Sequence, residues 1–564
     1  MTTETTLRGF LAAVVAAGLS SCVAPGRISP SVVNRYQQTL ADHEARHRGQ
    51  DGLQPYQPIP AIEPRKLPVV NEGGRGRVHL SLPQAILRAL ANNVEIQLVS
   101  YDPAVAREEM VRAAAEFDYV LSGSYTHEIT DERSVSTVGG GRADERTWQA
   151  GLKQKTVTGA DWSLAWSMTR TWDNQGFRTL ATRFEPRMTL QVTQPLLRDA
   201  WPEFNLARLR IARANRSSSE EAFRQKVEET VTEVISTYWL LVQSRRELEI
   251  QDELVRMTED TRDRMKLRRA LDVTDVEVQQ SETAVAIRKA TLTRTRNALV
   301  DVEKRLARLL ADDQINALSD VQIVPVTLPS DVPVMLDPTD QLVTALEHNP
   351  ILAQARLAIQ VADINVSVAR NQTLPRLELA ASVGMQAVSG TKHDATEKFW
   401  TADYISSSIG VLLEYPIGNR DRIAQLRQKR YERLKAVATM QNTVDQIAVV
   451  VDERIRQVRA SLEEMDEQQA AAEAARLQLR ALEAREKMRD QLSPAFLQTK
   501  LQAQETLAEA KRGYVRVVVE YNVALVELER AKGTVLELNG VKLALPAAMG
   551  EEPWPVENDQ QPVP

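Results

Sequence analysis

The stretch that decides the fold is residues 204–271, FNLARLRIARANRSSSEEAFRQKVEETVTEVISTYWLLVQSRRELEIQDELVRMTEDTRDRMKLRRAL. It contains no proline and no glycine, and a single helix of this length would be about 100 Å long. Globular helices are usually far shorter, so this one must pack lengthwise on partners. Its apolar residues recur at steps of four, three or seven, as in the seam of a coiled coil. They are Phe223, Val227, Val231, Val234, Tyr238, Leu241, Leu248 and Val255.

A second stretch of the same kind occupies residues 421–490, again without proline or glycine. Its apolar residues have the same spacing and include Ile423, Leu426, Val437, Val444, Ile447, Val451, Ile455 and Val458. The two stretches predict one long helix in each half of the chain, each followed by a return helix.

The segments around the long helices also occur twice, which indicates an internal repeat. Residues 89–94 (ALANNV) are echoed by residues 345–350 (ALEHNP), and in each half a helix, strands, a long helix and a return helix follow in that order. The first predicted repeat is 80–315, with an opening helix from Ser81 to about 117, strands within 119–194, the long helix 204–271 and a return helix. A connector with several prolines follows at 316–338. The second predicted repeat is 339–535, with an opening helix to about 372, strands within 376–415, the long helix 421–490 and a return helix.

The strand segments alternate apolar and polar residues. The clearest case places Trp162, Leu164, Trp166 and Met168 on one face, opposite small polar residues. Amphipathic strands with aromatic residues near their ends suit the lipid-facing wall of a membrane barrel, whereas a soluble sandwich would bury the same stripe in its core. The strands lie between helices of about 100 Å, and the chain begins with the export signal described next. Both features favour the interpretation that the strands face a membrane.

The first 22 residues are typical of a signal peptide: a basic residue, an apolar run too short to span a bilayer, and small residues up to Cys22. Leu19-Ser20-Ser21-Cys22 resembles a bacterial lipobox, which predicts acylation of Cys22 and attachment of the N-terminus to a bilayer. The alternative is an ordinary cleaved signal with an unmodified cysteine. Residues 23–79 are predicted to be an extended arm and residues 536–564 a disordered tail.

Composition excludes several classes of function. The net charge of −6 and the pI of about 5.8 give no electrostatic basis for binding nucleic acid. Apart from the N-terminus, no continuous run of 18 apolar residues exists, and on this ground we expect no helical membrane span. His43-Glu44-Ala45-Arg46-His47 fits a zinc-protease pattern, but its charged surroundings favour a chance match. No catalytic constellation is present, so we expect neither an enzyme nor a bound metal or cofactor.

Three features together resemble the TolC family of bacterial outer-membrane efflux proteins: the duplicated opening at residues 89–94 and 345–350, the strand exit YPIGNR at 415–420, and the helix start SPAFLQ at 493–498. The resemblance covers about residues 80 to 535. It implies a mainly α-helical protein with membrane strands, in which duplicated long helical hairpins form a periplasmic tunnel and each chain of a homotrimer contributes strands to a shared outer-membrane β-barrel.

The resemblance also implies a function. The protein would be the passive outer-membrane channel of a tripartite efflux or type I secretion system, coupled to an inner-membrane pump through a periplasmic adaptor. Family members usually give four barrel strands per chain, whereas the first half of this chain alone has about four strand-like segments. Either the Trp148–Trp172 hairpin is an insertion, or the barrel is larger than usual.

By position, the resemblance places a periplasmic gate at the two helix turns. The matching residues are Arg268, Arg269, Asp272 and Asp275 at the first turn and Arg489 and Asp490 at the second. Rings of like charge would select permeants by sign, and Arg–Asp pairs between chains could hold the gate shut. The alternative is that these residues are solvated charges that stabilise helix ends. An alternative for the whole protein is a lipid-anchored periplasmic coiled-coil scaffold without a pore.

Overall fold

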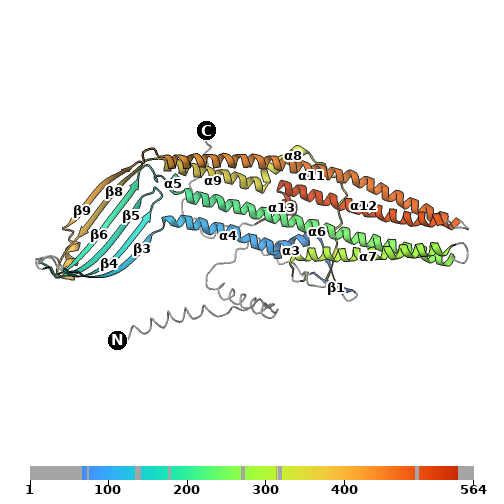
Figure 1. Ribbon diagram of the computed structural model, residues 1–564, viewed down its shortest axis with the longest axis horizontal. Coiled ribbons are helices and arrows are strands. Elements are labelled where there is room, and N and C mark those ends of the chain that lie inside the picture. The colour runs from blue at the N-terminus through green and yellow to red at the C-terminus, as the bar shows by residue number, and fades with distance from the viewer. Residues whose placement is uncertain are drawn as a thin grey trace, which may run out of the picture. The chain divides into compact units, whose positions relative to one another are not determined.

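The computed structural model describes residues 67–72, 75–133, 141–175, 179–268, 273–312, 314–315, 321–488 and 494–543. These residues belong to one compact unit, in which a sheet of long strands adjoins the ends of several helices (Figure 1). The elements discussed below are β1 (Val69–Glu72), β2 (Arg75–Leu80), α3 (Leu82–Asn92), α4 (Val94–Ala114), η1 (Ala115–Phe117), β3 (Val120–Asp131), β4 (Arg142–Lys155), β5 (Asp161–Asp173), β6 (Thr182–Pro195), α5 (Pro202–Asn205), α6 (Ala207–Arg268), α7 (Asp275–Leu310), β7 (Val321–Pro325), α8 (Pro338–His348), α9 (Pro350–Gln372), β8 (Arg376–Gln386), α10 (Lys392–Trp400), β9 (Ile405–Glu414), α11 (Arg420–Met488), α12 (Pro494–Lys532) and α13 (Val535–Leu538).

The two long helices are α6, with 62 residues, and α11, with 69. They are about 90 and 100 Å long at the usual rise per residue. Each is followed by an antiparallel return helix, α7 after α6 and α12 after α11. The predicted fold class, long helical hairpins in both halves with strands between the helices, is confirmed.

The apolar seam of α6 is buried along its middle third. Phe223, Val227, Val231, Val234 and Tyr238 are fully enclosed and form the largest hydrophobic cluster together with α3, α7 and parts of α12 and α13. Burying this much apolar surface is what stabilises a helix far longer than propensity alone would support.

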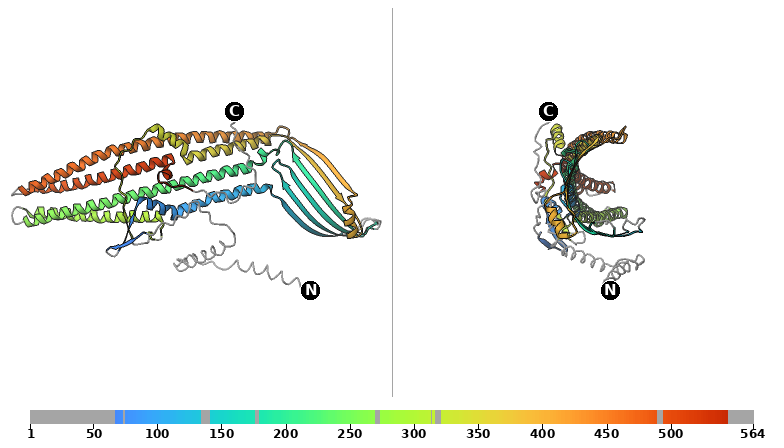
Figure 2. Two further views of the ribbon diagram at one scale, coloured as in Figure 1. Left: turned by 180° about the vertical axis from the view of Figure 1, so that it is seen from behind. Right: turned by 90° about the vertical axis from the view of Figure 1, so that its left-hand side faces the viewer.

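The helices form one layer. Next to the sheet, α4 packs on α6, α6 on α9, and α9 on α11; farther away, α7 packs on α6, α6 on α12, and α12 on α11. The end-on view in Figure 2 shows helices and strands along one arc. The layer has two free edges, one formed by α4 and α7 and the other by α11.

The internal repeat is visible in two equivalent asparagines. Asn93 caps α4 by accepting hydrogen bonds from the amides of the second and third residues of the helix, and its side-chain amide donates to Leu309 O (2.8 Å) at the end of α7. Asn349 caps α9 in the same way and donates to Ala531 O (2.9 Å) at the end of α12.

These caps correct one prediction in each half. The expected continuous helices, from Ser81 to about 117 and onward from residue 345 to about 372, are each two helices that break at the capping asparagine. At both asparagines ψ is close to +120°, an extended conformation that ends one helix and begins the next. Pro103 lies inside α4.

A small sheet lies against the middle of α6. Its strand order is β1-β2-β7, with β2 and β7 parallel. The Tyr238 hydroxyl of α6 donates to Leu80 O (3.0 Å) and accepts from the Thr327 amide (3.0 Å), which fixes both segments on the helix. Since β1 and β2 lie within residues 69–80, the end of the segment predicted as an extended arm is strand.

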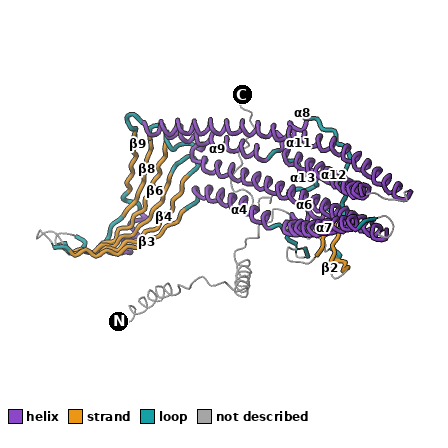
Figure 3. The backbone as a smooth tube through the Cα atoms, turned by 45° about the vertical axis from the view of Figure 1, so that its right-hand side comes forward, coloured by secondary structure: helices purple, strands orange, loops and turns teal. Residues whose placement is uncertain are grey.

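The large sheet has six antiparallel strands in the order β3-β4-β5-β6-β8-β9 (Figure 3). The first repeat supplies four strands and the second supplies two. The junction between the halves is the pairing of β6 with β8, where Leu190 lies opposite Val383.

Two further helices differ from expectation. The polar sequence of residues 389–402 predicts a loop. The segment instead contains α10, which is capped by Thr391 and anchored by the buried Phe399. Helix α9 is long and apolar enough to cross a membrane by length and composition, although it contains no continuous apolar run. It packs between α6 and α11, although only 6% of its most apolar stretch is buried.

Candidate functional site

The two faces of the six-stranded sheet differ in polarity. The register carries one apolar row across five strands, Leu121, Leu152, Leu164, Leu190 and Val383, and the row ends at Ser407 of β9. The opposite face carries small and polar residues in two neighbouring rows, one that pairs Ser122 with Gly151 and one that runs through Ser163, Gln191, Ser382 and Ser408. Successive residues of a strand point to opposite faces, so the sheet separates an apolar side from a polar side.

The apolar face is open rather than packed. Leu121 is 80% exposed and Ile409 is 78% exposed, and Ile405, Val411 and Leu413 are also exposed. Monomeric soluble proteins rarely leave a contiguous apolar patch that runs across several strands uncovered.

The four residues predicted to face lipid share this face of β5. Trp162, Leu164 and Trp166 are partly or largely accessible, whereas Met168 is only 5% exposed and lies in a cross-strand row between Trp148 and Pro186. Contact of these four residues with lipid stays a prediction.

Aromatic pairs occur at two levels of this face. Tyr119 and Trp162 meet edge to face near the helices, with ring centroids 6.2 Å apart. Tyr125 and Trp148 lie 5.4 Å apart, six residues further along β3 and therefore about 20 Å away. Aromatic residues at two levels of an apolar strand face are typical of the two interfaces of a bilayer.

At the far end from the sheet, the two helical hairpins pack on each other. An apolar cluster joins Met265 of α6 and Val278 of α7 to Phe496 and Leu497 of α12. Each hairpin end is thus held by the other as well as by its own helix pair.

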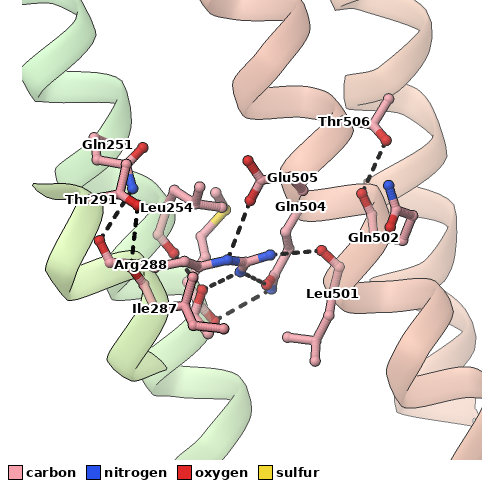
Figure 4. A network of polar contacts seen from close by, with 12 residues as sticks. Gln251, Leu254, Ile287, Arg288, Thr291, Leu501, Gln502, Gln504, Glu505 and Thr506 are labelled. Carbon is pink, nitrogen blue, oxygen red and sulfur yellow. Dashed lines mark hydrogen bonds and ion pairs between the residues drawn. The ribbon is translucent and has the colours of Figure 1, made fainter. Parts of the chain in front are cut away.

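A polar network lies next to this cluster and is centred on Arg288 of α7, whose side chain is 7% exposed (Figure 4). Its guanidinium donates to Thr258 of α6, to Gln504 Oε1 (3.1 Å) and to Leu501 O (2.8 Å) of α12. Nε lies 3.4 Å from a carboxylate oxygen of Glu505. One side chain therefore links α6, α7 and α12.

Burial lowers the pKa of the Arg288 guanidinium from its usual value, and the nearby Glu505 carboxylate opposes that change. The guanidinium nevertheless stays charged, because arginine is protonated at any physiological pH. It is a buried charge with partners from both hairpins, and its free energy depends on their staying together.

The same region contains a second buried ion pair. Lys500 of α12 donates to Glu486 of α11 (2.7 Å), and Arg264 of α6 lies 3.8 Å from the same carboxylate. Gln504 also donates to Thr261 Oγ1 (3.0 Å) of α6. The seam between the hairpins is thus apolar in its middle third, polar around Arg288 and apolar again at Met265 near the tip. Polar seam residues fix register at a cost in stability.

The predicted gate residues are only partly described. Arg268 is the last residue of α6 and Asp275 is the first residue of α7. Arg269, Asp272, Arg489 and Asp490 lie outside the described residues, as do Cys22 and the His43–His47 motif. The role of all of them stays a prediction.

The Arg288 network was not predicted, although the sequence contains a signal for it. Ser281, Val285 and Arg288 are spaced as seam residues of α7, so a basic residue occupies a position where an apolar one is expected. Across the part of the chain that the structure describes, no group of three His, Cys, Asp or Glu side chains could hold a metal ion.

Comparison with known proteins identifies the architecture. Three crystal structures are similar, and each alignment covers 80% of this chain. A membrane protein from Pseudomonas aeruginosa has a TM-score of 0.60 and 19% identity over 93% of its length, and the outer membrane protein VceC from Vibrio cholerae has a TM-score of 0.59 and 18% identity over 96% of its length. The Campylobacter jejuni CmeC outer membrane channel has a TM-score of 0.59 and 16% identity over 86% of its length. This chain has the fold of the TolC-like outer-membrane channels.

Sequence supports the same assignment for the second half. Residues 342–534 match the family model described as outer membrane efflux protein. No curated protein sequence matches the chain. In this TolC-like protein the two-faced sheet and the paired hairpin ends are the two candidate functional sites.

Proposed function

We propose that this protein is the outer-membrane channel of a tripartite efflux or type I secretion system, a passive duct coupled to an inner-membrane pump through a periplasmic adaptor. The observation that carries the proposal is the six-stranded sheet, apolar on one face and polar on the other, which continues directly into helices about 100 Å long. The helix lengths suit a path through the periplasm.

The sheet is suited to be a segment of a barrel wall. Inside hydrocarbon every backbone amide and carbonyl must be paired, which a closed barrel achieves and an open sheet does not. In this arrangement Trp162, Leu164 and Trp166 would face lipid and the polar rows would line water.

Copies of the chain would close the barrel. β3 and β9 are the unpaired edges of the sheet, and they continue the two edges of the helix layer. Both helix edges expose apolar side chains, for example Leu98 and Ile287 on one and Val449 on the other. Two different edges that pair with each other make a head-to-tail interface, which forms a ring when its rotation closes. The TolC-like fold supports a ring of three.

The periplasmic tip would be the gate. Contacts around Arg288 hold the two hairpins of one chain together, and a shift of one hairpin against the other would widen the tip. Charges at the two turns, Arg268, Arg269, Asp272, Asp275, Arg489 and Asp490, would form rings across the three copies and influence which ions pass.

We also propose that Cys22 is acylated and attaches the N-terminus to the outer membrane. The sequence around it supports this, since a cysteine closes the apolar run of a signal peptide. Efflux of small molecules and secretion of proteins would use the same duct, because the pump that selects the cargo is a separate chain.

The alternative of a pore-free periplasmic scaffold is less well supported. A soluble cap would bury the apolar face of its sheet, yet β9 presents Ile405, Ile409, Val411 and Leu413 to the outside. No described helix covers them. A lipid-facing wall accounts for this exposure directly.

Single-channel recording in planar bilayers tests the proposal. Purified protein and a Cys22→Ser variant are compared, since the variant removes the tether but leaves the sheet intact. We expect both to be extracted only with detergent, to migrate as trimers and to give discrete conductance steps once the tip is opened by the Arg288→Ala substitution. Monomeric, water-soluble Cys22→Ser protein without conductance would refute the channel.

A further inference from the structure

The six-stranded sheet contains one hairpin that is joined to no helix. β3 follows α4 through η1, β6 leads into α5 and α6, β8 follows α9, and β9 leads into α11. β4 and β5 are joined at their helix end only by the turn at 156–160. Four strands are thus continuous with the helix layer, and the β4–β5 hairpin is additional.

This hairpin is part of the sheet and not an appendage to it. Residues 120–131 of β3 pair with 142–153 of β4 without a break, and β5 pairs with β6 along twelve residues. The hairpin separates β3 from β6, which would otherwise be the neighbours at that point.

The turn of the hairpin is seated on the helix layer. Lys155 forms an ion pair with Glu116 (2.7 Å), Gln154 donates to Phe117 O (3.0 Å), and the Trp201 amide donates to Thr158 O (3.2 Å). At Gly159, where φ is +90°, a Cβ would lie 2.6 Å from Asp199 O. The turn therefore fills the space between the end of α4 and the start of α6.

The hairpin also has the two faces of a barrel wall. Trp148, Leu152 and Leu164 continue the apolar face, and Gln149 and Ser167 continue the polar face. It lengthens the circumference of the wall and leaves the lumen free.

We propose that the β4–β5 hairpin widens the membrane pore, so that three copies form a barrel of eighteen strands. This inference rests on the proposed channel function. With strands about 4.8 Å apart and tilted by about 40°, eighteen strands enclose a backbone diameter of about 36 Å, whereas twelve would enclose about 24 Å.

The wider barrel matches the helix layer of each chain. Six strands at that spacing and tilt span about 38 Å, and four helices packed about 9.5 Å apart span the same width. The membrane end is therefore no narrower than the tunnel, and it admits hydrated solutes about 20 Å across once side chains are allowed for. Permeating solutes are therefore selected by size at the periplasmic tip of the helices and not at the membrane end.

Distances between spin labels on the three copies test the width. A Gln191→Cys substitution in the Cys22→Ser background places one label per chain on the polar face of β6, and the chain has no other cysteine. For eighteen strands, equivalent backbone positions are about 31 Å apart in a three-fold ring; for twelve strands they are about 21 Å apart. The matched control is Asn215→Cys on α6, which reports the helix layer.

A deletion of residues 142–173 removes the hairpin and keeps Gln191. We expect the label distance to shorten by about 10 Å in this variant, while the distance at Asn215 changes little. A distance near 21 Å in the full-length trimer would overturn the inference by itself, whether or not the deletion variant folds. If the full-length protein forms no trimer and its Arg288→Ala variant gives no conductance, the proposed function fails as well, so the two failures are distinguishable.

Discussion

Replacing Arg288 by alanine should open the periplasmic tip. The side chain makes three contacts from α7 to α12, with Gln504 Oε1 at 3.1 Å, Leu501 O at 2.8 Å and Glu505 at 3.4 Å. A buried hydrogen bond from a charged donor contributes about 1.5–3 kcal/mol, and Glu505 adds less because its side chain is 39% exposed and solvent screens its charge. Allowing for water that enters the site, the substitution should weaken the contact between hairpins by about 3 kcal/mol.

This loss is large enough to detect in single channels. About 3 kcal/mol changes an equilibrium between closed and open tips by roughly two orders of magnitude. The open fraction of Arg288→Ala channels in planar bilayers should rise accordingly. Arg294→Ala is the matched control, because Arg294 lies on the same helix with its side chain exposed. It should gate like the unmodified protein.

Two results would refute this reasoning. If Arg288→Ala trimers form and remain as closed as those of Arg294→Ala, the network does not hold the tip. If the variant loses its trimer or unfolds, Arg288 stabilises the fold without acting on the gate. Arg288→Lys separates charge from geometry, since lysine keeps the charge but cannot reach several partners at once, and intermediate opening is expected.

Three further predictions concern stability. Burial raises the pKa of Glu228 to about 7. The folded state therefore keeps the carboxyl proton at a pH where the unfolded chain has lost it. As a result, the free energy of unfolding falls as the pH rises from about 4.5 to 7. Glu228→Gln should stabilise by up to about 3 kcal/mol at pH 8 and negligibly at pH 4, and equal shifts in urea midpoint at both pH values would contradict this. Gly159→Ala should cost about 2 kcal/mol or more because of its φ of +90° and the close Asp199 carbonyl, so an unchanged melting temperature would argue against the seated turn. Asn349→Ala and Asn93→Ala should each cost about 1–3 kcal/mol in urea unfolding, and markedly unequal losses would speak against equivalent roles for the two caps.

The fold was largely accessible from the sequence because its strongest signals are periodic. Long stretches without proline or glycine, with apolar residues at seam spacing, permit few structures other than long paired helices. The duplicated order of motifs then constrained the arrangement of strands. The breaks at Asn93 and Asn349 escaped prediction, because an asparagine can sit inside a helix or cap one, and the choice depends on the carbonyl that its side chain reaches across the structure.

The candidate gate was harder to predict from the sequence. Charges at helix turns are visible in any sequence, but they lie mostly outside the described residues, whereas the network that the structure brings together is centred on Arg288. Its partner Thr258 is 30 residues away and Gln504 is 216 residues away along the chain. A basic residue at a seam position signals an unusual contact, but it does not name the partner.

By itself, the sequence determined the long hairpins, the duplication and the two-faced strands, because helix and strand periodicity are local properties of the chain. Only the tertiary structure decided that the β4–β5 hairpin is inserted between β3 and β6, and that Arg288 lies where two hairpins meet. Strand order and buried polar contacts depend on pairing between distant segments, and many pairings satisfy the same local pattern. Packing of the whole chain selects one of them.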